Sequence, residues 1–265
     1  MNLSETWTTG TVSTDDVDLQ YYRTGDGPPV LMAHGMYDSG RRWVPLGSDL
    51  AADYDVIAYD ARGHGHSDAP ETGYDIETRV ADLVAVVNGL DLTDPILIGH
   101  SMGAATAAWA AADHPDLPRG LVLEEPSRFR EAPEISMEKA QEIARERLRE
   151  SKALSIEERM EKHYDDGEHD PEHVRRLAAS VDECSPHIAM LAQKHPPVKQ
   201  AFDEITCPAL VLRRDVDVMD RVKDLNAAAR LADGRLVHIP NAGHYVFRDE
   251  YDAAYAELRA FLQRV

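Results

Sequence analysis

The stretch Pro95-Ile96-Leu97-Ile98-Gly99-His100-Ser101-Met102-Gly103-Ala104-Ala105 decides the fold. It places a G-x-S-x-G pattern directly between an apolar run typical of a buried strand and an alanine-rich run typical of a helix. A strand-turn-helix this tight strains the serine backbone and raises its hydroxyl above the edge of the sheet. Both glycines are needed, because side chains there would collide where strand and helix cross. The context predicts that Ser101 is a nucleophile.

Short apolar runs recur along the chain, and helical patterns separate most of them. The strand candidates are residues 30–33, 56–59, 96–98, 121–123, 210–212 and 236–239. The clearest helical pattern begins at Asp75, and two others cover residues 222–231 and 251–261. This alternation predicts an α/β fold with a mostly parallel, twisted sheet flanked by helices. Alternating stretches at residues 6–12 and 17–23 predict an antiparallel hairpin before it.

The alternation stops between about residues 126 and 205, where the patterns predict helices alone. Charged, amphipathic stretches cover residues 135–148, 156–164, 174–181 and 188–193. An all-helical insertion in an α/β chain most simply covers the C-terminal edge of the sheet, where ligands bind. We therefore predict a core domain of residues 1–126 and 206–265 and a helical cap of residues 127–205.

The charge balance is strongly acidic. The chain has 48 acidic and 28 basic residues, a formal net charge of −20 and an isoelectric point near 4.9. Such a surface repels nucleic acid and anionic membranes, so neither is expected as a partner. Lysine is rare as well, which is typical of proteins that stay soluble in high salt, and we expect a halophilic source. An acidic enzyme from a GC-rich mesophile is the alternative.

Cysteine and metal-ligand patterns are sparse. Cys184 and Cys207 form neither a disulfide framework nor a metal-type pair. Residues 163–173 are rich in His, Asp and Glu, but their spacing matches no familiar metal motif. The first six residues lack the features of a signal peptide, and no apolar stretch is long enough to span a bilayer. We expect a cytoplasmic protein that uses no metal and no organic cofactor.

A serine nucleophile needs a base, and the base needs an acid to orient it. Of the 12 histidines, His244 is the candidate base, because its loop follows the last strand run and precedes the final helix. Asp217, in the loop after residues 210–212, is the first choice for the acid, in the chain order expected of such a fold. Asp215 is a neighbouring competitor. Glu124 and Glu125, which follow the strand run 121–123, are a further alternative.

The tetrahedral intermediate of acyl transfer needs backbone N–H donors for its oxyanion. The amide of Met102, directly after the nucleophile, is one candidate. The second is the amide of Met36, in the loop that follows the strand run 30–33, where Gly35 permits a tight turn.

These motifs together resemble the α/β-hydrolase superfamily, and within it the serine esterase and non-haem haloperoxidase-like lineage. The matching pieces cover nearly the whole chain outside the cap: residues 34–36, 60–67, 99–103, 215–217 and 243–244. The pattern D-x-R-G-x-G-x-S at residues 60–67 is expected to have a structural role. Trp43 corresponds to a residue that often borders the acyl pocket in this family. Arg214 departs from the family, which usually has glycine there, and leaves the choice between Asp217 and Asp215 open.

We add Tyr37, Phe129 and Tyr245 to Trp43 as candidate pocket residues. The serine implies an acyl-enzyme rather than the carboxylate-based ester of dehalogenases and epoxide hydrolases. The prediction is a carboxylesterase-like serine hydrolase acting on a small-molecule ester with a small or medium acyl group. Alternatives with the same triad are perhydrolase or cofactor-free haloperoxidase activity, and cleavage of a lactone, a thioester or a C–C bond. A ligand-sensing protein on the hydrolase fold is the alternative outside enzymes. The oligomeric state and the substrate itself are left open by the sequence.

Overall fold

One eight-stranded sheet organises the molecule in the computed structural model, which describes residues 6–129, 135–164, 170–192 and 196–265. The strand order is β1-β2-β4-β3-β5-β6-β7-β8, with antiparallel pairing of β1 with β2 and of β2 with β4 and parallel pairing elsewhere. The strands are β1 (Thr8–Ser13), β2 (Asp18–Thr24), β3 (Pro29–Ala33), β4 (Asp55–Tyr59), β5 (Ile96–His100), β6 (Gly120–Glu124), β7 (Ala209–Arg213) and β8 (Gly234–His238). The predicted hairpin and mostly parallel sheet are confirmed.

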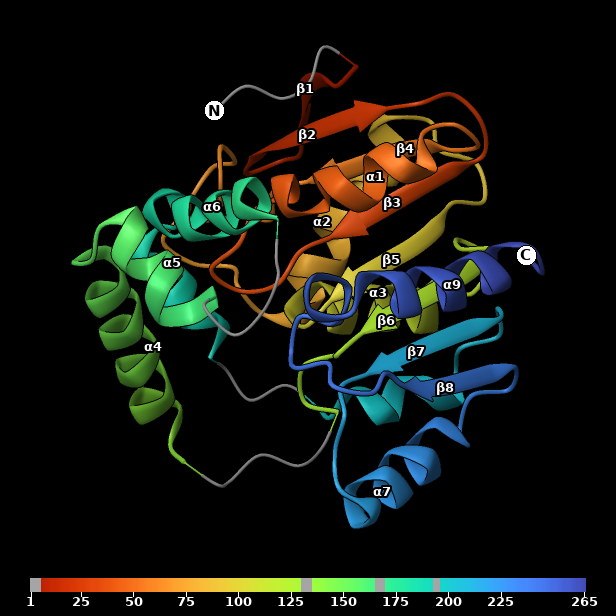
Figure 1. Cartoon of the computed structure of the whole chain (residues 1–265). Coiled ribbons are helices and arrows are strands. Elements are labelled where there is room, and N and C mark those ends of the chain that lie inside the picture. Colours follow the sequence, from red (N-terminus) through yellow and green to blue (C-terminus); the bar gives the residue numbers. More distant parts are fainter. Residues whose placement is uncertain (1–5, 130–134, 165–169, 193–195) are drawn as a thin grey trace.

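Helices cover both faces of this sheet (Figure 1). The helices of the core are α1 (Val44–Leu50), α2 (Ile76–Gly89), α3 (Met102–Asp113), α7 (Val218–Ala228), α8 (Val246–Asp249) and α9 (Tyr251–Leu262). Side chains of α2, α3 and α7 share a buried cluster with one face, and side chains of α1, α8 and α9 share a second cluster with the other. Within β3, Leu31 packs into the first cluster and Val30 into the second, because successive side chains of a strand point to opposite faces.

Between β6 and β7 the described residues form helices alone. They are α4 (Met137–Lys152), α5 (Ile156–Tyr164) and α6 (Pro171–Ser180), with the 3-10 helices η2 (Val181–Glu183), η3 (Pro186–Leu191) and η4 (Val198–Asp203). Figure 1 shows α4, α5 and α6 grouped beside one edge of the core. The sequence predicts an ordinary helix over residues 188–193, whereas the 3-10 helix η3 occupies residues 186–191 and residue 193 lies outside the described residues. Ser136 caps α4 by accepting a hydrogen bond from the Lys139 amide.

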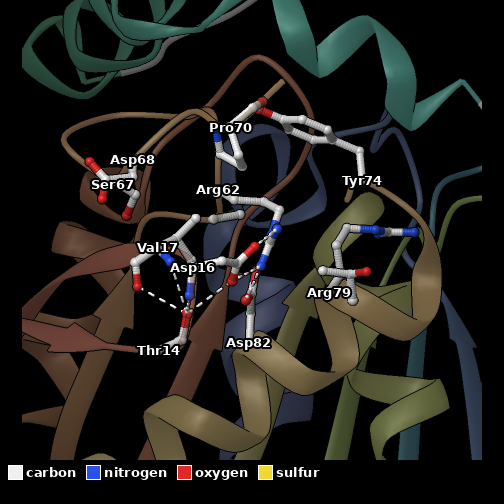
Figure 2. Close-up of polar contacts among 12 residues, drawn as sticks. Thr14, Asp16, Val17, Arg62, Ser67, Asp68, Pro70, Tyr74, Arg79 and Asp82 are labelled. Carbon is white, nitrogen blue, oxygen red and sulfur yellow. Dashed lines mark hydrogen bonds and ion pairs between the residues drawn. The ribbon is translucent and has the colours of Figure 1, made fainter. Parts of the chain in front are cut away.

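Two charged residues fix the D-x-R-G-x-G-x-S turn, which therefore has the structural role expected of it. Asp60 is fully buried and accepts hydrogen bonds from the amides of Gly40 and His66. Arg62 forms a bidentate pair with Asp82, with both N···O distances at 2.6 Å. Figure 2 shows this guanidinium between Asp82 of α2 and Asp16 of the loop between β1 and β2. The turn is thus attached to two distant parts of the core.

The described residues contain no helix long and apolar enough to cross a membrane, and no group of three or more His, Cys, Asp or Glu that could hold a metal. Residues 1–5, part of the stretch read as lacking a signal peptide, lie outside the described residues. So do residues 165–169, part of the segment rich in metal-ligand side chains.

Candidate active site

Ser101 occupies a strained turn at the centre of the sheet. β5 ends at His100 and α3 begins at Met102, so Ser101 alone joins them, with φ 49° and ψ −107°. A non-glycine residue in such a conformation costs about 1–3 kcal/mol and is typical of functional sites. The Ser101 amide donates to the carbonyl of Glu124 at 2.9 Å, and the Ser127 amide donates to the Ser101 carbonyl at 2.9 Å. The end of β6 therefore holds the turn from the neighbouring strand.

The two glycines around the serine lie where no side chain fits. A Cβ on Gly103 would lie 2.3 Å from the Ala33 carbonyl oxygen, and a Cβ on Gly99 would lie 2.6 Å from the backbone of Ala104. The contacts are with backbone atoms, so no side-chain movement relieves them. The steric reason for the G-x-S-x-G pattern is therefore present in the structure.

His244 lies beside this turn. Its imidazole ring centroid is 4.9 Å from that of His100, the residue before Ser101, and its carbonyl oxygen is 3.0 Å from His100 Nε2. The His244 side chain is 42% exposed and Ser101 is half-buried, so both are open to a substrate. The turn of the predicted nucleophile and the loop of the predicted base, 143 positions apart by number, are thus in contact through His100.

The carboxylate in contact with His244 is that of Glu125. Oε2 of Glu125 lies 3.4 Å from His244 Nδ1, the long end of the hydrogen-bond range. Such bonds are often long in an enzyme without substrate and tighten when substrate binds. Glu125 directly follows β6 and has φ 44°, a second strained residue at the carboxyl edge of the sheet. The strain turns its carboxylate away from the strand and towards the histidine loop.

Arg213 at the end of β7 and the amide of the following Arg214 also contact the Glu125 carboxylate. Oε1 of Glu125 accepts a hydrogen bond from the Arg214 amide at 2.8 Å and lies 2.8 Å from Nη1 of Arg213. Burial is the largest single effect and raises the pKa of Glu125, but hydrogen bonds from His244 and the Arg214 amide, with the charges of Arg213 and His244, bring the pKa below its usual value. A buried carboxylate that stays ionised is what an imidazolium needs beside it.

Asp217, the first choice for this acid from the sequence, has a different position. It is the N-cap of α7, is exposed, and accepts a hydrogen bond from the Asp220 amide at 2.9 Å. Asp215 is also exposed and pairs with Arg221 at 2.5 Å. Within the described residues, neither carboxylate contacts His244, and the alternative Glu125 does. The departure at Arg214 fits this arrangement, because its amide and side chain both approach Glu125.

The loop that follows β3 runs against the serine turn, as the oxyanion-hole expectation requires. A Cβ on Gly35 would lie 2.5 Å from His100 Nδ1 and 3.4 Å from Ser101 Cβ, so only glycine lets the loop come this close. Met36 follows it directly. Met102 is the first residue of α3, and its amide has no acceptor within the helix. Met102 therefore directly follows Ser101, and Met36 follows a glycine that is in contact with the serine turn.

The four candidate pocket residues separate into three places. Tyr37 and Tyr245 line one cavity of about 340 Å³ between the core and α4, α5 and α6, together with Asp38, Arg147, Glu150, Ser151, Lys162, Leu177 and Val181. Trp43 is buried and lines a different cavity of about 410 Å³ beside Phe247. Phe129 packs in the core, 5.8 Å from the Phe202 ring and 4.4 Å from the Arg213 guanidinium. Of the four candidates, the two tyrosines therefore line the cavity beside α4, α5 and α6 (the cap cavity), and Tyr245 directly follows His244.

Comparison with known proteins agrees with this architecture. The family described as alpha/beta hydrolase fold matches residues 28–251. The chain belongs to this family. A 2-(acetamidomethylene)succinate hydrolase from Mesorhizobium japonicum is 30% identical over 87% of this α/β hydrolase and 86% of that protein. A non-heme chloroperoxidase from Streptomyces lividans is 42% identical, over 37% of each chain.

Solved structures resemble the whole hydrolase fold. The crystal structure of E-2-(acetamidomethylene)succinate hydrolase covers 97% of this chain and 99% of its own, with a TM-score of 0.79 and 25% identity. An esterase from Exiguobacterium antarcticum, 23% identical, has the same TM-score over 96% of this chain and 98% of its own. The eight-stranded sheet with flanking helices is thus the fold of known hydrolases.

Proposed function

We propose that this α/β hydrolase is a serine hydrolase that cleaves a carboxylic ester through an acyl-enzyme. Ser101 Oγ attacks the carbonyl carbon and passes its proton to His244, while Glu125 orients the imidazole and stabilises the imidazolium. The amides of Met36 and Met102 bind the oxyanion. The proton then goes to the departing alcohol, and water repeats the sequence to release the acid. The single observation that carries this proposal is the strained Ser101 turn beside the His244–Glu125 pair.

The cap cavity favours a small or medium acyl substrate that carries a negative charge. Arg147 and Lys162 line the cavity of about 340 Å³ together with Glu150 and with Asp38, whose pKa burial raises to about 6. Two ion pairs within α4, Lys139 with Glu142 and Arg149 with Glu146, involve other residues of that helix than Arg147. The Mesorhizobium relative is named for a succinate derivative, and a carboxylate on the substrate is what two cationic side chains recognise.

Turnover of short-chain nitrophenyl esters in high salt tests the proposal. We expect steady hydrolysis by the wild type and none by Ser101→Ala, and we expect a fluorophosphonate to label only the wild type. The matched control is Ser48→Ala, which removes an exposed hydroxyl that accepts a hydrogen bond from Trp7. Equal hydrolysis by wild type and Ser101→Ala would refute the serine mechanism.

Peroxide is the second candidate acceptor, because the Streptomyces chloroperoxidase is similar over part of the chain. The same acyl-enzyme would then give a peracid instead of an acid. Competition between hydrogen peroxide and water for the acetylated enzyme separates the two, and an unchanged yield of acetic acid at high peroxide would leave hydrolysis as the activity.

A further inference from the structure

Arg42 is the centre of a buried ionic cluster beneath the serine turn. It lies in the 3-10 helix η1 (Gly40–Trp43), and its side chain is 2% exposed. Nη2 lies 3.1 Å from Glu124 Oε2, and Nη1 contacts both Asp38 Oδ2, at 3.4 Å, and Nδ1 of His100. Asp38 is in the loop after β3, whereas His100 and Glu124 end β5 and β6. One guanidinium therefore joins the carboxyl ends of three neighbouring strands.

Two further hydrogen bonds connect this cluster to the loop of the catalytic base. His100 Nε2 lies 3.0 Å from the carbonyl oxygen of His244, and the Phe247 amide donates to Glu124 Oε1 at 3.0 Å. The first bond holds the residue that carries the imidazole. The second holds the start of α8, three residues later. The core partners of these two hydrogen bonds, His100 and Glu124, are both in contact with Arg42.

The chemistry of the arginine fixes the state of His100. A guanidinium only donates hydrogen bonds, so Nδ1 of His100 accepts and the ring proton is on Nε2, where it is donated to the His244 carbonyl. Burial, and then the Arg42 charge, hold the pKa of His100 well below its usual value, so the ring is neutral. The tautomer that holds the His244 loop is therefore the one that Arg42 selects.

We propose that Arg42 is a positioning residue for His244, acting through His100 and Glu124. The inference rests on the proposed function, since it assigns Arg42 a part in that same site. Buried ion pairs contribute little net stability, because desolvation offsets their attraction, so stability alone does not account for the cluster. Misplacing a catalytic group by about 1 Å costs about 100-fold in rate. A rigid attachment of the His244 loop therefore has a direct consequence for turnover.

Variants of His100 test the hydrogen-bond relay. In His100→Gln the amide oxygen can accept from Arg42 and the amide nitrogen can donate to the His244 carbonyl, whereas His100→Leu can do neither. We expect His100→Gln to retain kcat within about tenfold, and His100→Leu to lose about 100-fold in kcat with little change in KM. Each kcat is expressed per site titrated with a fluorophosphonate, so unfolded protein does not enter the value. Equal kcat values for the two variants would overturn the proposal.

Arg42→Lys tests the cluster from its centre and serves if His100→Leu does not fold. A single ammonium cannot reproduce the planar fork that reaches several partners, so we expect kcat to fall at least tenfold with KM unchanged. The control is Arg259→Lys, at an exposed pair with Asp53 far from the site, which should leave kcat unchanged. A wild-type kcat for Arg42→Lys overturns the proposal.

The two proposals fail in distinguishable ways. Absence of ester turnover by the wild type refutes the proposed substrate chemistry, while the rate at which the fluorophosphonate labels Ser101 still compares wild type, His100→Gln and His100→Leu. Equal labelling rates in all three overturn the positioning role by themselves.

Discussion

Glu125 and His244 stand 119 positions apart in the chain, yet the Glu125 carboxylate lies 3.4 Å from Nδ1 of the His244 imidazole. Their meeting places the acid of the candidate triad at the end of β6 rather than after β7. The physical basis is the end of β7, where Arg213 and the following Arg214 both contact the Glu125 carboxylate and compensate its charge. An acid held in this way is available for orienting an imidazole.

Removing the charge of this acid should abolish most of the activity. We expect Glu125→Gln to lower kcat about 1000-fold, because the imidazole loses the partner that fixes its tautomer and stabilises its charge. Asp217→Asn is the matched control, since it keeps a capping side chain at α7 and should retain wild-type kcat. Steady-state hydrolysis of a short ester measures both. An inactive Asp217→Asn enzyme with an active Glu125→Gln enzyme would return the role to Asp217.

Filling the space at Gly103 should destabilise the fold. Gly103→Ala puts a Cβ against the Ala33 carbonyl oxygen, and a steric conflict with backbone should lower the free energy of unfolding by about 2–4 kcal/mol. Gly120→Ala is the control, because its Cβ would meet only side-chain atoms of Val265 and Phe261 at 3.3 Å or more. Urea unfolding of both variants measures the free energy of unfolding. Equal losses in the two variants would mean that the contact of α3 with the end of β3 at Gly103 is not sterically restricted.

Asp38 should make the stability depend on pH in a defined window. Burial raises the pKa of Asp38 from 3.8 to about 6. A carboxyl with a raised pKa stabilises the fold when it is protonated, so its contribution is complete below about pH 3.8 and is lost as the pH rises to about 6. The loss is about 3 kcal/mol. Unfolding free energies of wild type and Asp38→Asn should differ by a pH-dependent amount between these limits, and a constant difference would contradict the assignment.

The net charge of −20 should make the fold salt-dependent. Self-repulsion of like charges is screened by salt, so we expect the melting temperature at pH 7.5 to rise between 0.1 M and 2 M KCl. Near pH 4.9, where the net charge is close to zero, the same salt step should have a much smaller effect. A melting temperature that does not respond to salt at either pH would remove the physical basis for expecting a halophilic source.

The cations of the cap cavity should govern substrate charge preference. Arg147→Gln should raise KM for a nitrophenyl ester that carries a free carboxylate by about tenfold, because one hydrogen-bonded charge pair is lost. KM for the neutral ester of equal length should stay unchanged. Arg149→Gln, on the same helix but paired with Glu146, serves as the control. An equal effect of Arg147→Gln on both esters would mean that the residue shapes the cavity and does not recognise charge.

Local sequence determined most of the architecture. The apolar runs around residues 30–33, 56–59 and 96–98 became β3, β4 and β5, because a short continuous apolar run is typical of a strand buried on both faces. The serine turn was equally predictable from the sequence, because its glycines are required by contacts within a few residues or with the adjacent strand. The short helix α1 and the 3-10 form of η3 were not predicted, because neither has a long enough periodic pattern.

The tertiary structure alone decided which acid meets His244 and where the pocket residues lie. From the sequence, Asp217 and Glu125 both follow a strand and both fit a triad, because chain order does not specify which strand end faces the histidine loop. The answer depends on the backbone conformation of Glu125, whose φ of 44° turns the carboxylate, and on arginines contributed by the next strand. Such contacts between distant residues arise only when the sheet is assembled, and no local pattern encodes them.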